Sequence, residues 1–345
     1  MLERGELDRL VAWLDRAGLP GRGEELTIEA LAGGATNEVY VLRRGGPAMV
    51  LRRPPADSPE RAKTIGREAR VLGALAGTDV PHAGLLGFCE DEGVLGVPFY
   101  VMELVDGWSP ASAGPRGPAP FDRDLDARAE LGREIVRGIA RLASVDWRAR
   151  GLEGFGRPDG FHERQVPRWQ KYLEGFAFRP LPGLDEAAAW LSTHRPRQWE
   201  PGIMHGDYSF ANVMFRHGAP GRLAAIVDWE MTTIGDPLLD LGWLLMRWPS
   251  PDGERPRGIF DMDGMPAPDE VLDIYADASG RGVEDIDYYL VLAYFKNAIV
   301  LEGRYAKFAS GEIADPKLER FGDWVLEMAA LAGELSGAST LAPAR

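Results

Sequence analysis

Two short segments of the sequence carry its strongest structural signal, "HGDYSFANVMF" at residues 205–215 and "AAIVDWE" at residues 224–230. The first places Asp207 and Asn212 five residues apart, and the second places Asp228 directly after an apolar run. Asp and Asn are common in turns for reasons unrelated to function. The alternative interpretation is that all three side chains face one phosphate group.

The chemistry of phosphoryl transfer favours that alternative. It needs Mg²⁺ bridging the phosphates and a group that orients or deprotonates the attacking hydroxyl. Mg²⁺ prefers a few hard oxygen ligands, which the Asp228 carboxylate and the Asn212 amide supply, and Asp207 suits the base role. The Asp-to-Asn interval is that of the protein-kinase catalytic loop, and an Asp after an apolar strand matches the kinase metal loop. We therefore predict a catalytic Asp207 with Asn212 and Asp228 as metal ligands.

The N-terminal third of the chain has strand patterns around a single main helix. After a short amphipathic helix near the N-terminus, apolar periodicity predicts a helix at 59–75. Strands are expected at 26–31, 39–43, 48–53, 85–89 and 99–105. We predict a five-stranded antiparallel sheet in this part of the chain.

The rest of the chain is predicted to be mainly helical. The stretch "DGWSPASAGPRGPAP" at 106–120 has the composition of a long loop. Helices are expected at 122–144, 163–176, 238–248, 268–278, 286–308 and 316–335, and short strands near 203–205, 213–215 and 223–227. We expect an N-terminal nucleotide-binding lobe at 1–105 with a hinge at 103–107, a helical C-terminal lobe at 106–335, and a disordered tail at 336–345.

The loop "LAGGATNEVYVL" at 31–42 is a candidate phosphate loop. Gly33 and Gly34 allow the backbone to approach a ligand closely, and Thr36 and Asn37 add side-chain donors. Such a loop can turn its N–H groups toward phosphate oxygens. The same residues also make an ordinary hairpin turn, so both interpretations stay open.

Arg52 and Glu68 are candidates for an ion pair with each other. On a strand Val50 and Arg52 share a face and Arg53 points the other way, so one arginine can enter a cleft, although a solvated strand end is the commoner place for arginine. Glu68 lies near the apolar face of the 59–75 helix. A buried carboxylate needs a cationic partner, and Arg52 is the candidate.

Four further residues near the motifs are assigned structural roles. His205 could be a metal ligand, but the five histidines show no HxH or HExxH spacing, which favours a structural role. Asp236 and Asp240 precede or begin a helix, where capping and loop bracing are expected. Trp243 is predicted to lie in the core.

Composition and net charge restrict the classes of binding partner and the cellular compartment that we expect. The sequence has 39 basic and 53 acidic residues, a net charge of −14, which should repel nucleic acid and anionic lipid. Cys89 is the only cysteine and is expected to be a buried thiol, so no intrachain disulfide forms. No apolar stretch approaches the ~18 residues that span a bilayer, and the N-terminus is charged, so we expect a cytoplasmic protein without membrane insertion.

The motifs resemble a known family. "HGDYSFANVMF" followed by "IVDWEMTTIGDPLLDLGWLL" resembles the aminoglycoside-phosphotransferase superfamily of kinase-like small-molecule kinases, over about residues 26–308. "VLRRPP", "QVPRWQKYLE" and "DWEMTTIGDPLLDL" are most similar to the branch found fused to, or beside, acyl-CoA dehydrogenases. The resemblance implies an α+β, protein-kinase-like two-lobed fold, with a small antiparallel-sheet N-lobe and a larger, mainly helical C-lobe. It also implies ATP or GTP, Mg²⁺, a small-molecule hydroxyl substrate and a link to acyl-CoA metabolism.

The resemblance also implies roles for residues outside the two main motifs. Glu68 becomes the acid of the small-lobe ion pair, and Glu103 to Val105 the hinge that offers backbone groups to the adenine. Arg52 stands where the family usually has lysine. Arginine is permanently charged and forked, so the geometry at the phosphates differs from that of lysine, although a bidentate grip remains available.

Several functions compete at this point. The branch resemblance favours a kinase for a hydroxyacyl or lipid-like compound, and the acidic surface would suit a cationic aminoglycoside or another antibiotic. A non-catalytic, nucleotide-binding pseudokinase is kept open by Arg52, whereas the joint presence of Asp207, Asn212 and Asp228 argues against it. A metal-dependent hydrolase using His205 and Asp207 lacks the clustered ligands that such sites require.

Overall fold

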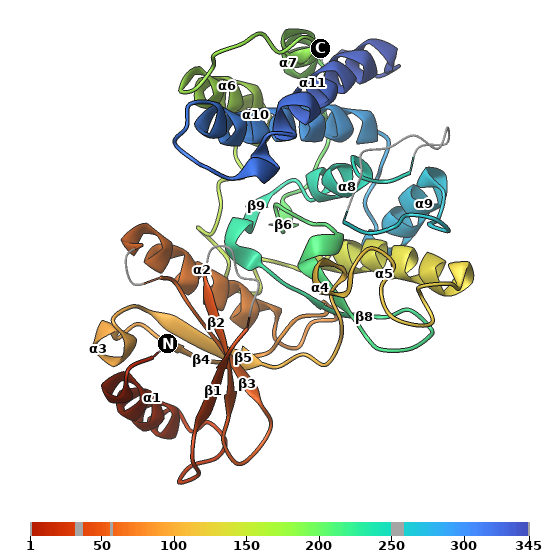
Figure 1. Ribbon diagram of the computed structural model, residues 1–345. Helices are drawn as coiled ribbons and strands as arrows, with labels where there is room; N and C mark the ends of the chain where they lie inside the picture. The colour runs from red at the N-terminus through yellow and green to blue at the C-terminus, as the bar shows by residue number, and fades with distance from the viewer. Residues whose placement is uncertain (1, 32–36, 56–57, 250–258, 344–345) are drawn as a thin grey trace.

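The computed structural model describes residues 2–31, 37–55, 58–249 and 259–343, and has two lobes of unequal size (Figure 1). The small lobe contains a five-stranded antiparallel sheet of order β1-β2-β3-β5-β4. Its strands are β1 (Thr27–Ala30), β2 (Glu38–Arg43), β3 (Met49–Arg53), β4 (Leu85–Cys89) and β5 (Phe99–Glu103). The predicted antiparallel sheet is therefore confirmed.

Helices cover both faces of this sheet. On one side α1 (Arg4–Arg16) buries Leu10 and Leu14 against Leu42 and Leu51 of the sheet, and the four-residue α3 (Glu92–Leu95) joins it. On the other side α2 (Pro59–Leu75) faces the large lobe and shares its core. Successive strand residues point to opposite faces, which is why Phe99 and Val101 of β5 enter the core under α1 while Tyr100 enters the core shared with the large lobe.

The large lobe is mainly helical. Its helices are α4 (Pro110–Ala113), α5 (Leu125–Ala143), α6 (Phe161–Glu174), α7 (Leu184–Thr193), α8 (Leu238–Leu245), α9 (Pro268–Ser279), α10 (Ile286–Ala309) and α11 (Phe321–Ala338). Two short antiparallel pairs complete it: β6 (Gly202–Met204) with β9 (Thr233–Gly235), and β7 (Val213–Phe215) with β8 (Leu223–Ile226). Three 3-10 turns, η1 (Phe210–Asn212), η2 (Trp229–Met231) and η3 (Pro316–Leu318), lie between these elements. α10 runs through the centre of the lobe and packs on α8 and α11.

The structure differs from the prediction at a few elements. The short helices α3 and α4, the helix α7 and the strand β9 were not predicted, and α4 lies in the stretch at 106–120 that was expected to be a loop. The helix expected at 316–335 is divided into η3 and α11. We expected a disordered tail from residue 336, but α11 continues to Ala338 and Ser339 donates from Oγ to Asp287 Oδ2 at 2.9 Å. The described end of the chain is therefore ordered by this hydrogen bond together with the packing of α11 on α10.

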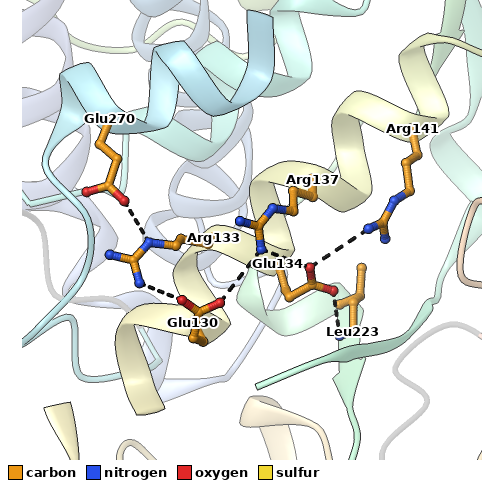
Figure 2. A network of polar contacts seen from close by, with 7 residues as sticks. All are labelled: Glu130, Arg133, Glu134, Arg137, Arg141, Leu223 and Glu270. Atoms are coloured by element: carbon orange, nitrogen blue, oxygen red, sulfur yellow. Dashed lines mark hydrogen bonds and ion pairs between the residues drawn. The ribbon is translucent and has the colours of Figure 1, made fainter. Parts of the chain in front are cut away.

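A network of partly exposed ion pairs links three elements of the large lobe (Figure 2). Arg133 on α5 lies 2.6 Å from Glu270 on α9 and 2.6 Å from Glu130. Glu134 accepts a 3.3 Å hydrogen bond from the Leu223 N–H at the start of β8. The network therefore fixes α5 against α9 and against the strand that leads to Asp228.

Cys89 is buried, as predicted, at the end of β4. None of the helices within the described ranges has the length and apolar character needed to cross a membrane.

Candidate active site

The backbone of the 205–207 loop is held by a buried carboxylate. After β6 the chain turns at Gly206, where φ is +88° and a Cβ would lie 2.6 Å from the Met231 carbonyl oxygen, so glycine is required. Asp240 on α8 accepts from the His205 N–H at 2.6 Å and from the Gly206 N–H at 2.8 Å. Burial raises the pKa of Asp240, and these two donors oppose that shift. Asp240 therefore braces the loop, as the sequence predicted.

His205 ties this loop to the strand before Asp228. Its Nδ1 accepts from the Asp207 N–H at 3.3 Å, so Nε2 carries the proton and donates to the Val227 carbonyl at 2.9 Å. The ring is completely buried. The predicted structural role of His205 agrees with these contacts, because both ring nitrogens are used by backbone groups.

The Asp207 carboxylate is oriented by two side-chain donors. Asn212 Nδ2 donates to Asp207 Oδ2 at 2.9 Å and to its carbonyl at 2.8 Å, and the Trp243 indole donates to Oδ1 at 3.1 Å. Trp243 is 7% exposed, so it lies in the core as predicted. Its contact with Asp207 was missed, since a separation of 36 residues carries no local signal.

Strand pairing brings Asn212 next to Asp228. β7 pairs with β8 so that Val213 faces Ile226, and the Val227 N–H donates to the Asn212 carbonyl at 3.0 Å. Because Asn212 Nδ2 is occupied by Asp207, its amide oxygen is oriented away from that residue. Asp228 has φ of 65°, the one positive φ among non-glycine residues in the described part of the chain. A backbone in this region is strained, and such strain is concentrated at functional sites.

These two residues fit a magnesium ion by their chemistry. Asp228 offers a carboxylate that is 33% exposed, and Asn212 offers an amide oxygen. Across the described residues no group of three His, Cys, Asp or Glu side chains forms a metal cage. Mg²⁺ is commonly held by one or two protein oxygens together with substrate phosphates, so this sparse donor set suits it.

The ion pair expected between Arg52 and Glu68 is present. Arg52 Nε lies 3.0 Å from Glu68 Oε2, and Arg52 Nη2 lies 2.8 Å from Asp228 Oδ1, so one guanidinium joins β3, α2 and the metal loop. Glu68 is 0% exposed, and Tyr100 donates to its Oε2 at 2.9 Å. Burial raises the pKa of Glu68 to about 7, against the opposing effects of Arg52 and Tyr100. Its Oε1 is buried without a partner among the described residues, which explains why burial dominates.

The two arginines of β3 point to opposite faces, as the strand geometry predicted. Arg53 lies 2.7 Å from Glu38 and donates to the Leu95 carbonyl at 3.2 Å on the α1 side of the sheet. Neither arginine is solvated at a strand end, because each one pairs with a carboxylate on its own face of the sheet, Arg52 with Glu68 and Arg53 with Glu38. The functional candidate is therefore Arg52 alone.

The candidate phosphate loop is only partly described. Gly33, Gly34 and Thr36 lie outside the described residues. Asn37 is buried, and with its amide oxygen oriented toward Arg52 it accepts from Nη2 at 2.9 Å and from Nε at 3.3 Å. Asn37 thus contacts the arginine at the lysine position, where we expected it to offer a donor to phosphate.

The expected hinge lies at the end of β5. The Glu103 N–H donates to the Gly84 carbonyl at 2.9 Å, and Glu103 Oε2 accepts from the Gly84 N–H at 3.1 Å. Val105 follows and is half-buried. The Glu103 side chain therefore closes the β4–β5 pair.

Asp236 has a second buried role besides capping. Its Oδ1 accepts from the Leu238 N–H at 3.2 Å at the start of α8, and its Oδ2 contacts His162 Nε2 at 2.9 Å and the Tyr289 hydroxyl. All three side chains are buried. His162 was not singled out by the sequence, because its partner is 74 residues away.

Comparison with known proteins gives concordant results. A family model described as APH, phosphotransferase enzyme family, matches residues 27–273. Acyl-CoA dehydrogenase family member 11 of Gallus gallus is 32% identical over 97% of this chain, and family member 10 of Mus musculus is 30% identical over 88%. The chain spans only 43% and 28% of the lengths of those two relatives.

A solved structure is similar over nearly the whole chain. This structure is of a Ralstonia eutropha protein described as an aminoglycoside phosphotransferase, and it has a TM-score of 0.83 and 30% sequence identity to this chain. The superposition covers 98% of this chain and 99% of the other.

Proposed function

This chain belongs to the APH phosphotransferase enzyme family, and from that premise we propose that it transfers the γ-phosphoryl group of ATP or GTP, with Mg²⁺, to a hydroxyl group of a small molecule. The observation that carries the proposal is that Asp207, Asn212 and Asp228 lie together, Asp207 hydrogen-bonded to Asn212 and Asp228 just after the paired strand beside it. Asn212 contacts Asp207 directly and is paired beside Asp228 through β7 and β8. These three residues would thus supply a base and two metal-ligand oxygens.

Each residue of the site has a distinct task in this reaction. Asp228 and the Asn212 amide oxygen would hold Mg²⁺, whose charge offsets that of the transferring phosphoryl oxygens. Asp207, oriented by Trp243 and Asn212, would accept the proton of the attacking hydroxyl. Arg52 would hold phosphate oxygens with its forked guanidinium, which Glu68 positions. Asp228 is paired with Arg52 here, so it would exchange this partner for the metal.

The class of acceptor is supported by the relatives' names. Two relatives that match most of the chain are named acyl-CoA dehydrogenase family members, which supports a hydroxylated acyl or lipid-like acceptor and a link to acyl-CoA metabolism. The solved relative named after the aminoglycoside phosphotransferases supports an antibiotic as the second candidate.

Titration calorimetry with ATP and GTP, with and without Mg²⁺, tests the proposal together with ADP release over a panel of hydroxyl compounds. We expect Mg²⁺-dependent nucleotide binding that Asp228→Ala weakens strongly and Asn212→Ala weakens less, because a neutral amide is the poorer ligand. Wild-type protein that binds no nucleotide would contradict the proposal. Nucleotide binding without ADP formation over the whole panel would favour a pseudokinase instead.

A further inference from the structure

A group of cations gathers on the tryptophan that contacts Asp207. The Lys296 ammonium on α10 lies 4.8 Å from the centroid of the Trp243 ring, and the Arg247 guanidinium, just after α8, lies 4.9 Å from it. Lys296 also lies 5.6 Å from the ring of Trp169 on α6, over which Arg168 lies at 5.4 Å. We call Arg168, Arg247 and Lys296 the cationic cluster. Three helical segments thus place positive charge on one side of the candidate base.

The cationic cluster has no acidic partner of its own. Within the described ranges no carboxylate lies within ion-pair distance of these three side chains, and the hydrogen bond that Arg247 makes goes to the Trp243 carbonyl at 3.3 Å. Burial lowers the pKa of Lys296 and of Arg247, and for Lys296 the neighbouring Arg168 and Arg247 lower it further. Lys296 and Arg247 are both partly buried, so the lack of an ion-pair partner at each of them needs a reason, whereas Arg168 is exposed to solvent.

One structural explanation is that the cluster offsets the buried carboxylates nearby. The charges of Asp207 and Asp240 do act on Lys296, and that of Asp207 acts on Arg247. However, Asp240 already accepts two backbone N–H bonds, and both oxygens of Asp207 accept from side-chain donors. Lys296 and Arg247 therefore form no ion pair of their own with either carboxylate.

A neutral donor beside the cluster is also unused. The Trp169 indole N–H is buried and has no acceptor in the described part of the chain. Buried polar groups normally have partners, so an unused donor beside unpaired cations indicates an acceptor that a ligand brings. Arg168 and Trp169 belong to the "QVPRWQKYLE" motif, which the phosphoryl-transfer residues leave unexplained.

We propose that the cationic cluster binds an acidic group of the acceptor, a carboxylate or a phosphate, so that the substrate is an anionic hydroxyl compound. The inference rests on the proposed function and narrows its acceptor. The indole N–H of Trp243 donates to Asp207, and the ring of the same tryptophan is contacted by the Lys296 ammonium and the Arg247 guanidinium. The acidic group therefore binds close to the reacting hydroxyl. A cationic aminoglycoside is disfavoured there, because like charges repel at short range.

Matched pairs of compounds test this inference. Calorimetry on the full chain, loaded with Mg·ADP, compares short and medium-chain 3-hydroxy acids with their primary amides, and glycerol 3-phosphate with glycerol. Kanamycin is the cationic probe. We expect at least one acidic member to bind about tenfold or more tightly than its neutral partner, the usual effect of a charge-assisted hydrogen bond. The acid–amide and phosphate–alcohol pairs distinguish a carboxylate from a phosphate.

Variants identify the residues responsible. Lys296→Met and Arg247→Met should each reduce the preference for the acid, while Lys296→Arg keeps most of it because the charge remains. Lys171→Met, on the exposed face of α6, makes the same change in net charge and should leave the preference intact. Thermal unfolding of each variant establishes that it is folded, and Arg247→Met carries the test if Lys296→Met is not.

Several outcomes would overturn the inference. These are equal binding of acid and amide in every pair, no binding of any acid, tightest binding of kanamycin, or a preference that survives both Lys296→Met and Arg247→Met. Failure of the proposed function would instead appear as absent Mg·ATP binding and ADP release in wild-type protein. The two failures are therefore separable.

Discussion

Asp207 and Asp228 are held by different kinds of partner. Asp207 accepts from the neutral donors Asn212 and Trp243, whereas Asp228 is paired with the Arg52 cation. In the proposed reaction the first arrangement would orient a carboxylate toward the acceptor, and the second would place one beside the metal ion and the phosphates. Removing the two carboxylates should therefore affect different steps.

Asp207→Ala is expected to lower kcat by about 10²–10⁴, the usual contribution of a general base, with little change in Mg·ATP affinity. Turnover of an acceptor found by the ADP-release panel, together with calorimetry of Mg·ATP, measures both quantities. Trp243→Phe keeps the packing but removes the donor to Oδ1, so we expect about a tenfold lower kcat. Equal losses of Mg·ATP affinity in Asp207→Ala and Asp228→Ala would contradict this division of roles, and unimpaired turnover in Asp207→Ala would exclude it as the base.

Glu68 should make stability depend on pH. Its pKa is raised from about 4.5 to about 7, so between these values the folded state binds more protons at this site than the unfolded state does. The contribution to the free energy of unfolding is complete below about pH 4.5 and is lost as the pH rises through about 7. Urea unfolding of wild type and Glu68→Gln at pH 5 and pH 7.5 should show wild type losing stability relative to the variant. Parallel pH dependences in the two proteins would contradict the assignment.

At the scale of elements, two arginines join helices in different environments. Arg133 links α5 to α9 at the surface, where both it and Glu270 are partly exposed. Arg179, which lies between α6 and α7, makes a bidentate pair at 2.9 and 2.6 Å with Glu302 of α10, whose side chain is buried. Whether one partner of an ion pair is buried determines how much the free energy of unfolding falls when the other partner is removed.

Arg133→Met is expected to lower the free energy of unfolding by no more than ~1 kcal/mol, because solvent screens the pair. Arg179→Met should cost about 3–5 kcal/mol, because it leaves an uncompensated carboxylate inside the protein. Urea unfolding of the two variants measures the difference, and 1 M NaCl should reduce the smaller effect. Similar costs for the two variants would mean that burial of Glu302 does not control the energetics.

At the scale of the whole molecule, the chain has two separate hydrophobic cores. One lies between α1 and the sheet, and the other fills the large lobe and includes the buried face of α2. Since α2 shares the large-lobe core, the helix that carries Glu68 is coupled to the lobe that carries Asp228. The opposite face of the sheet is buried by α1.

This arrangement predicts that the two cores loosen independently. Leu14→Ala and Leu292→Ala both truncate fully buried side chains, and each should cost about 2–5 kcal/mol. Hydrogen exchange should show lost protection in β1 to β5 for Leu14→Ala, with α8 and α10 still protected. Leu292→Ala should expose α10 and its neighbours first. Uniform loss of protection in both variants would indicate a single cooperative core.

Features that depend on neighbours along the chain could be predicted from sequence patterns alone. The apolar periodicities predicted all five strands of the sheet and α2, because burial of one face imposes a short-range repeat. The five-residue interval between Asp207 and Asn212 and the place of Asp228 after a strand indicated a phosphoryl-transfer site, because one loop and one hairpin determine that geometry. Strand alternation also separated Arg52 from Arg53.

Contacts between segments that are distant in the sequence became visible in the three-dimensional structure alone. It brought Trp243 to Asp207, Asp240 to the 205–207 loop and Asn37 to Arg52. It also gathered Lys296, Arg247 and Arg168 around two tryptophans from three helical segments. The spacing of residues in the sequence carries no information on such pairs, because their distances depend on how whole helices pack. The burial that raises the pKa of Glu68 has the same origin, since a helix face becomes a core only when another lobe covers it.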